Sequence, residues 1–232
     1  MPVLLLIRHA TNDFVKTGRL PGRTPNIHLN EEGRRQAKAL AQLLRDQPLD
    51  AIYSSPLERA IETAWCIAAD RSLPVHICPD LADVDNGDYT GMEIKRLSED
   101  EATRDFWRTV VETPSQARFP NGEGLFDMQQ RVVKALEALA AAHPDLEAPA
   151  QAERAGPSAE DKPRRRPQTI AIVAHADVIK AALAHYLGMP FDNFQRLSIA
   201  PASISAVALG HDDKTGRRYT VVHYVNRIPP AQ

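Results

Sequence analysis

The stretch Val3-Leu4-Leu5-Leu6-Ile7-Arg8-His9 shapes the interpretation of the whole chain. It is an apolar run that stops abruptly at an arginine and a histidine. Such a run predicts a buried strand that delivers a cation and an imidazole to the loop at its carboxyl end. Because open α/β sheets bind ligands at that edge, Arg8 and His9 are candidate site residues.

A second strand-like run, residues 169–174, also ends in a histidine, His175. If the two strands are neighbours, His9 and His175 face one crevice. A lone histidine is more often a surface or core residue. Two histidines at equivalent strand ends favour a site instead.

Arg59 lies on a helix face that is otherwise apolar, within residues 55–64. An arginine beside a packed face must find an anion. Glu58 or Glu62 could supply it locally, so Arg59 is either a structural ion pair or part of an anion site.

Composition predicts one soluble domain spanning residues 1–232. The chain has 232 residues, 43% of them hydrophobic, which is enough for one sizeable core. The formal charge of -2 gives no footprint for nucleic acid or an anionic membrane. The amino-terminal apolar run is too short for a signal peptide or a membrane span, so we expect a cytoplasmic protein.

Strand-like and helix-like periods alternate along the chain. This alternation predicts an α/β fold with a mostly parallel central sheet and helices on both faces. A long loop is expected at residues 10–29, and loops of this length are usually functional. Helices are expected at 31–44 with Asn30 as cap, from Pro56 onward with Ser55 as cap, in the polar stretch that follows residue 91 and ends at about 113, at 124–139 and at 177–187. Strands are expected at 3–8, 51–53, 74–77, 169–174, 203–209 and 219–225.

Residues 144–168 are rich in proline and charge and almost lack large apolar side chains. Such a segment cannot offset its ordering entropy, so we expect a mobile surface insertion. Its Arg164-Arg165-Arg166 triplet is either a basic handle or part of a solvated linker, and the linker is favoured.

Several blocks of the sequence together resemble the histidine phosphatase superfamily, also called phosphoglycerate-mutase-like. They occur in the family's order, span nearly the whole chain outside 144–168, and resemble a branch that carries the label of probable phosphomutase. The blocks are Leu6-Ile7-Arg8-His9-Ala10-Thr11, residues 54–64 (SSPLERAIETA), residues 81–91, Pro120-Asn121-Gly122-Glu123-Gly124 and Ala174-His175-Ala176-Asp177.

The resemblance implies a phosphoglycerate-mutase-like fold and a metal-independent reaction without a cofactor. His9 would attack phosphorus and form a phosphohistidine, with its other ring nitrogen held by a backbone carbonyl. Arg8, Arg59 and a protonatable His175 would bind the phosphoryl oxygens. The resemblance further places substrate contacts in the loop after His9, at Thr11, Asn12, Arg19, Gly22 and Arg23.

The family usually takes the proton for the leaving group from a glutamate in the acidic block, and here that position holds Asp83. The pKa of an aspartate must be raised for it to act as an acid near neutrality. Asp85 and Asp177 are alternatives, although the neighbours of Asp85 favour a turn. Glu123 could cap a helix or orient an arginine.

Three functions remain open at this point. The first is a phosphatase acting on a small phosphorylated metabolite; the second is a phosphomutase, which would use the same residues; the third is a non-catalytic phosphate-binding module. The loop from Ala10 to Thr24 does not match the tighter pattern of glycolytic mutases, which favours hydrolysis. A metal hydrolase is disfavoured, because metal sites seldom place two arginines beside the ion and the chain has no HExxH spacing.

Overall fold

The computed structural model describes residues 1–147, 165–211, 215 and 217–230. The strands are β1 (Val3–Arg8), β2 (Ala51–Ser54), β3 (Val75–Ile77), β4 (Leu146–Glu147), β5 (Arg165–Arg166), β6 (Thr169–Ala174), β7 (Ile204–His211) and β8 (Arg218–Arg227). The α-helices are α1 (Asp13–Lys16), α2 (Glu31–Leu44), α3 (Glu58–Ala68), α4 (Ile94–Glu99), α5 (Arg104–Glu112), α6 (Leu125–Ala142) and α7 (Ala176–Tyr186). Short 3-10 helices are η1 (Pro79–Leu81), η2 (Gly87–Tyr89), η3 (Pro114–Gln116) and η4 (Phe191–Arg196).

Within the described residues, six strands form the main sheet in the order β3-β2-β6-β1-β7-β8. The pairs β3-β2, β2-β6 and β6-β1 are parallel, whereas β7 runs antiparallel to both of its neighbours. The prediction of a mostly parallel central sheet is therefore confirmed. Whether the chain forms a single domain stays a prediction.

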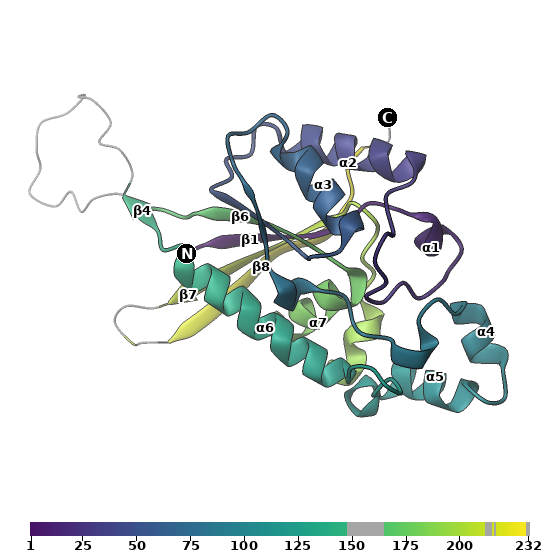
Figure 1. Ribbon diagram of the computed structural model, residues 1–232. Helices are drawn as coiled ribbons and strands as arrows, with labels where there is room; N and C mark the ends of the chain where they lie inside the picture. The colour runs from purple at the N-terminus through teal and green to yellow at the C-terminus, as the bar shows by residue number, and fades with distance from the viewer. Residues whose placement is uncertain (148–164, 212–214, 216, 231–232) are drawn as a thin grey trace, which may run out of the picture.

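Side chains of β1 alternate between two hydrophobic cores, because successive residues of a strand point to opposite faces. Leu5 and Ile7 pack with the apolar residues of α2 and α3. Leu4 and Leu6 pack on the other face with those of α6 and α7. Figure 1 shows the resulting three layers, with α2 and α3 above the sheet and α6 and α7 below it. The central strands are thus buried on both sides, as their continuous apolar runs predict.

Helix boundaries agree with the sequence except around α3. Asn30 caps α2 as expected, since its Oδ1 accepts a hydrogen bond from the Gly33 amide. The expected cap at Ser55 is wrong: α3 begins at Glu58, and its N-cap residue, Leu57, makes no side-chain cap bond. Ser55 is held elsewhere, as described below.

Most of the expected insertion at 144–168 lies outside the described residues, so its mobility stays a prediction. Its two ends are described, and they pair as the strands β4 and β5. Arg166, the last residue of the arginine triplet, forms a two-point ion pair with Asp50, with N–O distances of 2.6 and 3.1 Å. Arg166 therefore binds the carboxyl-terminal end of this segment to Asp50, next to β2.

The carboxyl ends of β1 and β6 meet at one edge of the sheet, where α1, α4 and α5 also lie (Figure 1). The α1 turn is the one helical segment of the long loop that follows His9 in the described chain. Among the described residues, no helix is both long enough and apolar enough to cross a bilayer.

Gly33 fixes the distance between α2 and this loop. A Cβ at residue 33 would lie 1.9 Å from the Thr11 carbonyl oxygen. Gly33→Ala must therefore push the loop away from the helix, and we expect it to lower the free energy of unfolding by about 1–3 kcal/mol. Urea denaturation measures this loss. The exposed change Arg35→Ala on the same helix should stay within about 0.5 kcal/mol, and equal stabilities of the two variants would contradict the close approach.

Candidate active site

The two histidines meet at the carboxyl edge of the sheet because β1 and β6 pair in register. Arg8 lies opposite Ala174, so His9 and His175 leave their strands side by side. Their ring centroids are 5.1 Å apart, and the rings are tilted by 60°. Both side chains are almost completely buried.

His9 is arranged with one ring nitrogen available. Its Nδ1 lies 2.7 Å from the Ala10 carbonyl oxygen, which can only accept, so Nδ1 carries the hydrogen. The lone pair of a neutral ring is then on Nε2. Burial, together with the charges of Arg59 and Arg8, lowers the pKa of His9 well below its usual value. The imidazole is therefore neutral at physiological pH, as a nucleophile requires.

His175 is held by a residue that the sequence analysis assigned to a helix cap. Its Nε2 lies 2.7 Å from the Ser55 hydroxyl oxygen, which also accepts a hydrogen bond from the Leu57 amide at 3.3 Å. The Ser55 hydroxyl hydrogen is thus free to bond Nε2, and this leaves the ring hydrogen on Nδ1. Only the fold reveals this role, since 120 residues separate the two partners.

Burial, the charge of Arg59 and the other nearby cations also lower the pKa of His175 well below its usual value. His175 is therefore neutral in the structure. An anion bound between the cations would favour its protonated form.

Arg59 is fully buried, at 0% exposure, and contacts Asp83, which also lies beside His175. Its Nη2 donates to the Gly22 carbonyl oxygen at 2.8 Å and to Asp83 Oδ2 at 3.1 Å. Its ion-pair partner in the structure is therefore Asp83 rather than the neighbouring Glu58 or Glu62. The local explanation of Arg59 as a pair within its own helix is wrong.

Several buried hydrogen-bond donors around the two histidines have no partner. Arg8 donates through Nη1 to the Ile199 carbonyl oxygen at 2.6 Å, and Asn12 uses its Oδ1 to cap α1. Among the residues that the structure describes, the buried side-chain nitrogen atoms without a hydrogen-bond partner are Arg8 Nε, Asn12 Nδ2, Arg59 Nε, Arg59 Nη1 and His175 Nδ1. Buried donors are nearly always satisfied in folded proteins. A group of them that includes two guanidiniums calls for an anion rich in oxygen atoms.

Asp83 supplies the carboxylate at this cluster. Its Oδ2 lies 3.5 Å from His175 Nδ1, and its Oδ1 accepts a hydrogen bond from the Val84 amide. Burial is the main cause that raises the pKa of Asp83 to about 6, and the charge of Asp177 adds to it, while Arg59 opposes it. A carboxyl group with such a pKa can carry a proton near neutrality.

The two other acids considered from the sequence have different environments. Asp85 accepts a hydrogen bond from the Gly87 amide and so closes the turn that its neighbours predict. Asp177 pairs with Lys180 at 3.1 Å, and its side chain is 30% exposed. Of the three, only Asp83 contacts both Arg59 and His175 in the described structure.

Some of the predicted substrate contacts in the loop after His9 lie at the cluster of Arg59 and Asp83, and others are bound elsewhere. Gly22 lies at the cluster, through its carbonyl bond to Arg59. Arg23 lies beside it, with Nε donating to the Asp83 carbonyl oxygen at 3.0 Å. Thr11 is buried and its amide donates to Gln36. Arg19 is not drawn into the cluster, because it is paired with Glu93 and the Gly91 carbonyl group.

No group of three His, Cys, Asp or Glu side chains that could hold a metal ion occurs among residues 1–147, 165–211, 215 and 217–230. The charged groups at the strand edge are instead dominated by the buried arginines.

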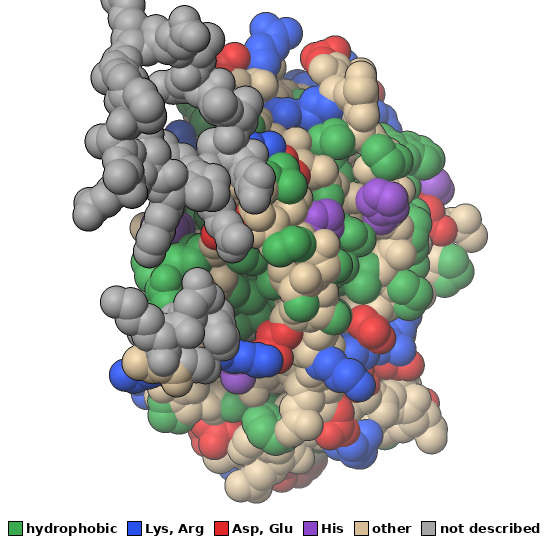
Figure 2. Space-filling view, turned by 90° about the vertical axis from the view of Figure 1, so that its left-hand side faces the viewer, with side chains coloured by type: hydrophobic (Ala, Val, Ile, Leu, Met, Phe, Trp, Pro, Cys, Tyr) green, Lys and Arg blue, Asp and Glu red, His purple; other side chains and the backbone are tan. Residues whose placement is uncertain are grey.

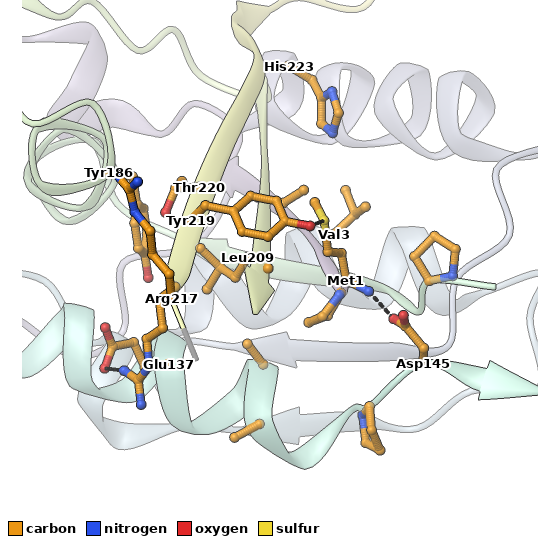
Figure 3. Close-up of a pocket in the computed structure, with 18 of the residues that line it drawn as sticks. Met1, Val3, Glu137, Asp145, Tyr186, Leu209, Arg217, Tyr219, Thr220 and His223 are labelled. Atoms are coloured by element: carbon orange, nitrogen blue, oxygen red, sulfur yellow. Dashed lines mark hydrogen bonds and ion pairs between the residues drawn. The ribbon is translucent and has the colours of Figure 1, made fainter. Parts of the chain in front are cut away.

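A wide hollow lies at the opposite, amino-terminal edge of the sheet. Figure 2 looks onto this face and shows hydrophobic side chains gathered in it. Figure 3 shows two contacts of Met1 in this hollow: its amino group contacts Asp145, and its sulfur accepts a hydrogen bond from the Tyr219 hydroxyl group. The candidate site residues lie at the other edge, where β1 and β6 end.

Comparison with known proteins agrees with the geometry. The family described as Histidine phosphatase superfamily (branch 1) matches residues 4–150 and 146–222. Phosphoserine phosphatase 1 of Hydrogenobacter thermophilus is 32% identical over 207 residues, covering 89% of this chain and 86% of the relative. Adenosylcobalamin/alpha-ribazole phosphatase of Salmonella typhimurium is 28% identical and covers 88% and 89%. The crystal structure of the alpha-ribazole phosphatase from Shigella flexneri superposes with a TM-score of 0.73 at 26% identity, covering 99% of this chain and all of that one.

The unpartnered donors make a prediction about anion binding. Inorganic phosphate at a hundred times its dissociation constant should stabilise the protein by about 2.7 kcal/mol, which corresponds to a rise in Tm of roughly 5 °C or more. Differential scanning calorimetry measures the shift. Arg59→Met should abolish it, whereas Arg118→Met, at an exposed ion pair, should retain it. An equal shift in both variants would show a general salt effect instead of a site.

Proposed function

This chain belongs to the histidine phosphatase superfamily, and we propose that it hydrolyses a small phosphomonoester through a phosphohistidine on His9. The observation that carries the proposal is the group of buried, unpartnered donors around two imidazoles and a carboxyl group. The family match together with phosphatase-named relatives supports a phosphoric monoester hydrolase. The residue roles described next are our assignment.

In the first step, Nε2 of His9 attacks phosphorus and the P–O bond to the leaving group breaks. Arg8, Arg59 and the Nδ1 hydrogen of His175 bind the three other phosphoryl oxygens, whose charge redistributes in the transition state. The leaving oxygen takes the proton of Asp83. The products are the free alcohol and a phosphohistidine, with Asp83 as carboxylate.

In the second step, a water molecule gives a proton to the Asp83 carboxylate and its oxygen attacks phosphorus. The P–N bond to His9 breaks, and phosphate leaves with the protonation state of the enzyme restored. One carboxyl group thus serves as acid and then as base, which its pKa of about 6 allows.

Hydrolysis is favoured over phosphomutase activity by the relatives reported above, whose names are those of phosphatases. By analogy with them, we propose a small phosphorylated metabolite as the substrate. A panel of such metabolites, assayed for release of inorganic phosphate, tests this proposal. Accumulation of an isomeric phosphate ester without free phosphate would instead indicate a mutase.

Two substitutions separate the assigned roles. His9→Ala should abolish hydrolysis of every substrate, because no nucleophile remains. Asp83→Asn should lower kcat/KM for alkyl phosphates by about a hundredfold or more. Its effect on kcat/KM for p-nitrophenyl phosphate should be much smaller, because kcat/KM reports only the first step and that leaving group needs little protonation. Steady-state kinetics measure both, and equal losses on the two substrates would refute the role of Asp83 as acid.

The pKa of Asp83 also predicts a pH profile. The acid must carry its proton in the first step, so kcat/KM for an alkyl phosphate should fall as pH rises through about 6, approaching tenfold per pH unit. The substrate's own second ionisation lies in the same range. Asp83→Asn is therefore the reference, since it keeps only the substrate's contribution. Profiles of the same shape in both proteins would mean that Asp83 does not titrate in the reaction.

A further inference from the structure

Asp83 has little freedom of its own, so the position of its backbone decides where its carboxyl group lies. An aspartate side chain has only two rotatable bonds, and Asp83 Oδ1 is already fixed by the amide of the next residue at 3.0 Å. A shift of the backbone at residue 83 would therefore move the carboxyl group away from Arg59 and His175. Such shifts are costly, since a misplacement of about 1 Å can lower a rate by about a hundredfold.

Two arginines from different parts of the chain bind this backbone. Arg131, on α6, donates through Nη1 to the carbonyl oxygens of Asp80 and Ala82, at 2.6 and 3.2 Å. Arg23, in the loop after His9, donates through Nε to the carbonyl oxygen of Asp83 at 3.0 Å. The carbonyl groups of residues 80, 82 and 83 are thus all bound by guanidinium groups.

Glu123 joins these two arginines. Its carboxylate binds Arg131 at two points, both at 2.9 Å, and binds Arg23 Nη2 at 2.9 Å. The side chains of Glu123 and Arg131 are only 15% and 18% exposed, so water screens this pair less than a surface ion pair. Glu123 Oε2 also faces the Asp85 amide at 3.4 Å, and the Glu123 amide donates to the Asp85 carbonyl group.

Two roles considered from the sequence do not account for this arrangement. One is Glu123 as a helix cap, and the other is Arg23 as a substrate contact. The N-cap residue of α6 is Gly124, and it makes no side-chain cap bond. Arg23 directs two of its donor nitrogens to the protein itself. The other expectation for Glu123, that it orients an arginine, agrees with its contacts.

We propose that Glu123 is a positioning residue for the general acid, acting through Arg23 and Arg131 on the backbone of residues 80–85. The inference rests on the proposed function, because it assumes that Asp83 protonates the leaving group. It assigns to the Glu123 side chain a task in the protonation step, beyond holding the fold together.

The test compares an alkyl phosphate, chosen as the best substrate of the panel, with p-nitrophenyl phosphate. Glu123→Gln keeps the size of the side chain but removes its charge and one of its acceptor atoms. We expect kcat/KM for the alkyl phosphate, which reports the first step alone, to fall by about tenfold or more, while kcat/KM for p-nitrophenyl phosphate changes by less than about threefold. KM for p-nitrophenyl phosphate should stay nearly constant.

The matched control is Asp127→Asn, which removes an acid paired with Arg118 in the first turn of the same helix. It should leave both rates unchanged. Arg131→Lys provides a second test if Glu123→Gln does not fold, because lysine keeps the charge but cannot bind Glu123 at two points. It should show the same selective loss for the alkyl phosphate.

Three results would overturn the inference: equal losses on both substrates, which indicate a purely structural role; a rise in KM alone, which indicates a substrate contact; or an unchanged alkyl rate. A failure of the proposed function looks different. In that case the wild-type protein releases no phosphate from any substrate, or Asp83→Asn shows no preference between the two leaving groups.

Discussion

Two guanidinium groups, that of Arg59 fully buried and that of Arg8 partly buried, lie together with too few anions to balance their charge, and the rest of the structure depends on this constraint. Arg59 is fully buried, and its one carboxylate partner, Asp83, has a raised pKa and so gives up its charge readily. Uncompensated buried charge is costly, and a protein tolerates it where a ligand restores the balance. Burial, together with the same cations, lowers the pKa of both histidines and keeps them neutral, which gives the site a nucleophile and leaves room for the charge of a phosphoryl group.

The fold produces this concentration of charge by simple means. Parallel pairing of β1 and β6 brings two strand ends together, and the loop after His9 folds back so that its Gly22 carbonyl group meets Arg59. The acid comes from a segment without regular strand structure, and its backbone is bound by two arginines that share Glu123. Rigid strands position the nucleophile, whereas an ionic network positions the acid.

The sequence predicted most of the fold, because apolar runs and helical periods are local signals. It also predicted the meeting of His9 and His175, since equivalent strand ends in a parallel sheet must share an edge. It failed where partners are far apart in sequence. Ser55 was expected to cap a helix and instead holds His175, and the sequence left open whether Arg59 pairs within its own helix, where the structure pairs it with Asp83. Arg19 lies in the loop where substrate contacts were expected, but its pairing with Glu93 depends on the tertiary structure.

The account's central claim is that phosphate passes through a covalent bond to His9, and rapid-quench trapping tests it most directly. The enzyme is mixed with substrate, quenched in alkali within the first turnover, digested and analysed by mass spectrometry. The account predicts one phosphoryl group on the peptide that contains His9, stable in alkali and lost in acid. Release of phosphate with no phosphorylated enzyme at any time, or a phosphoryl group on another residue, would contradict it.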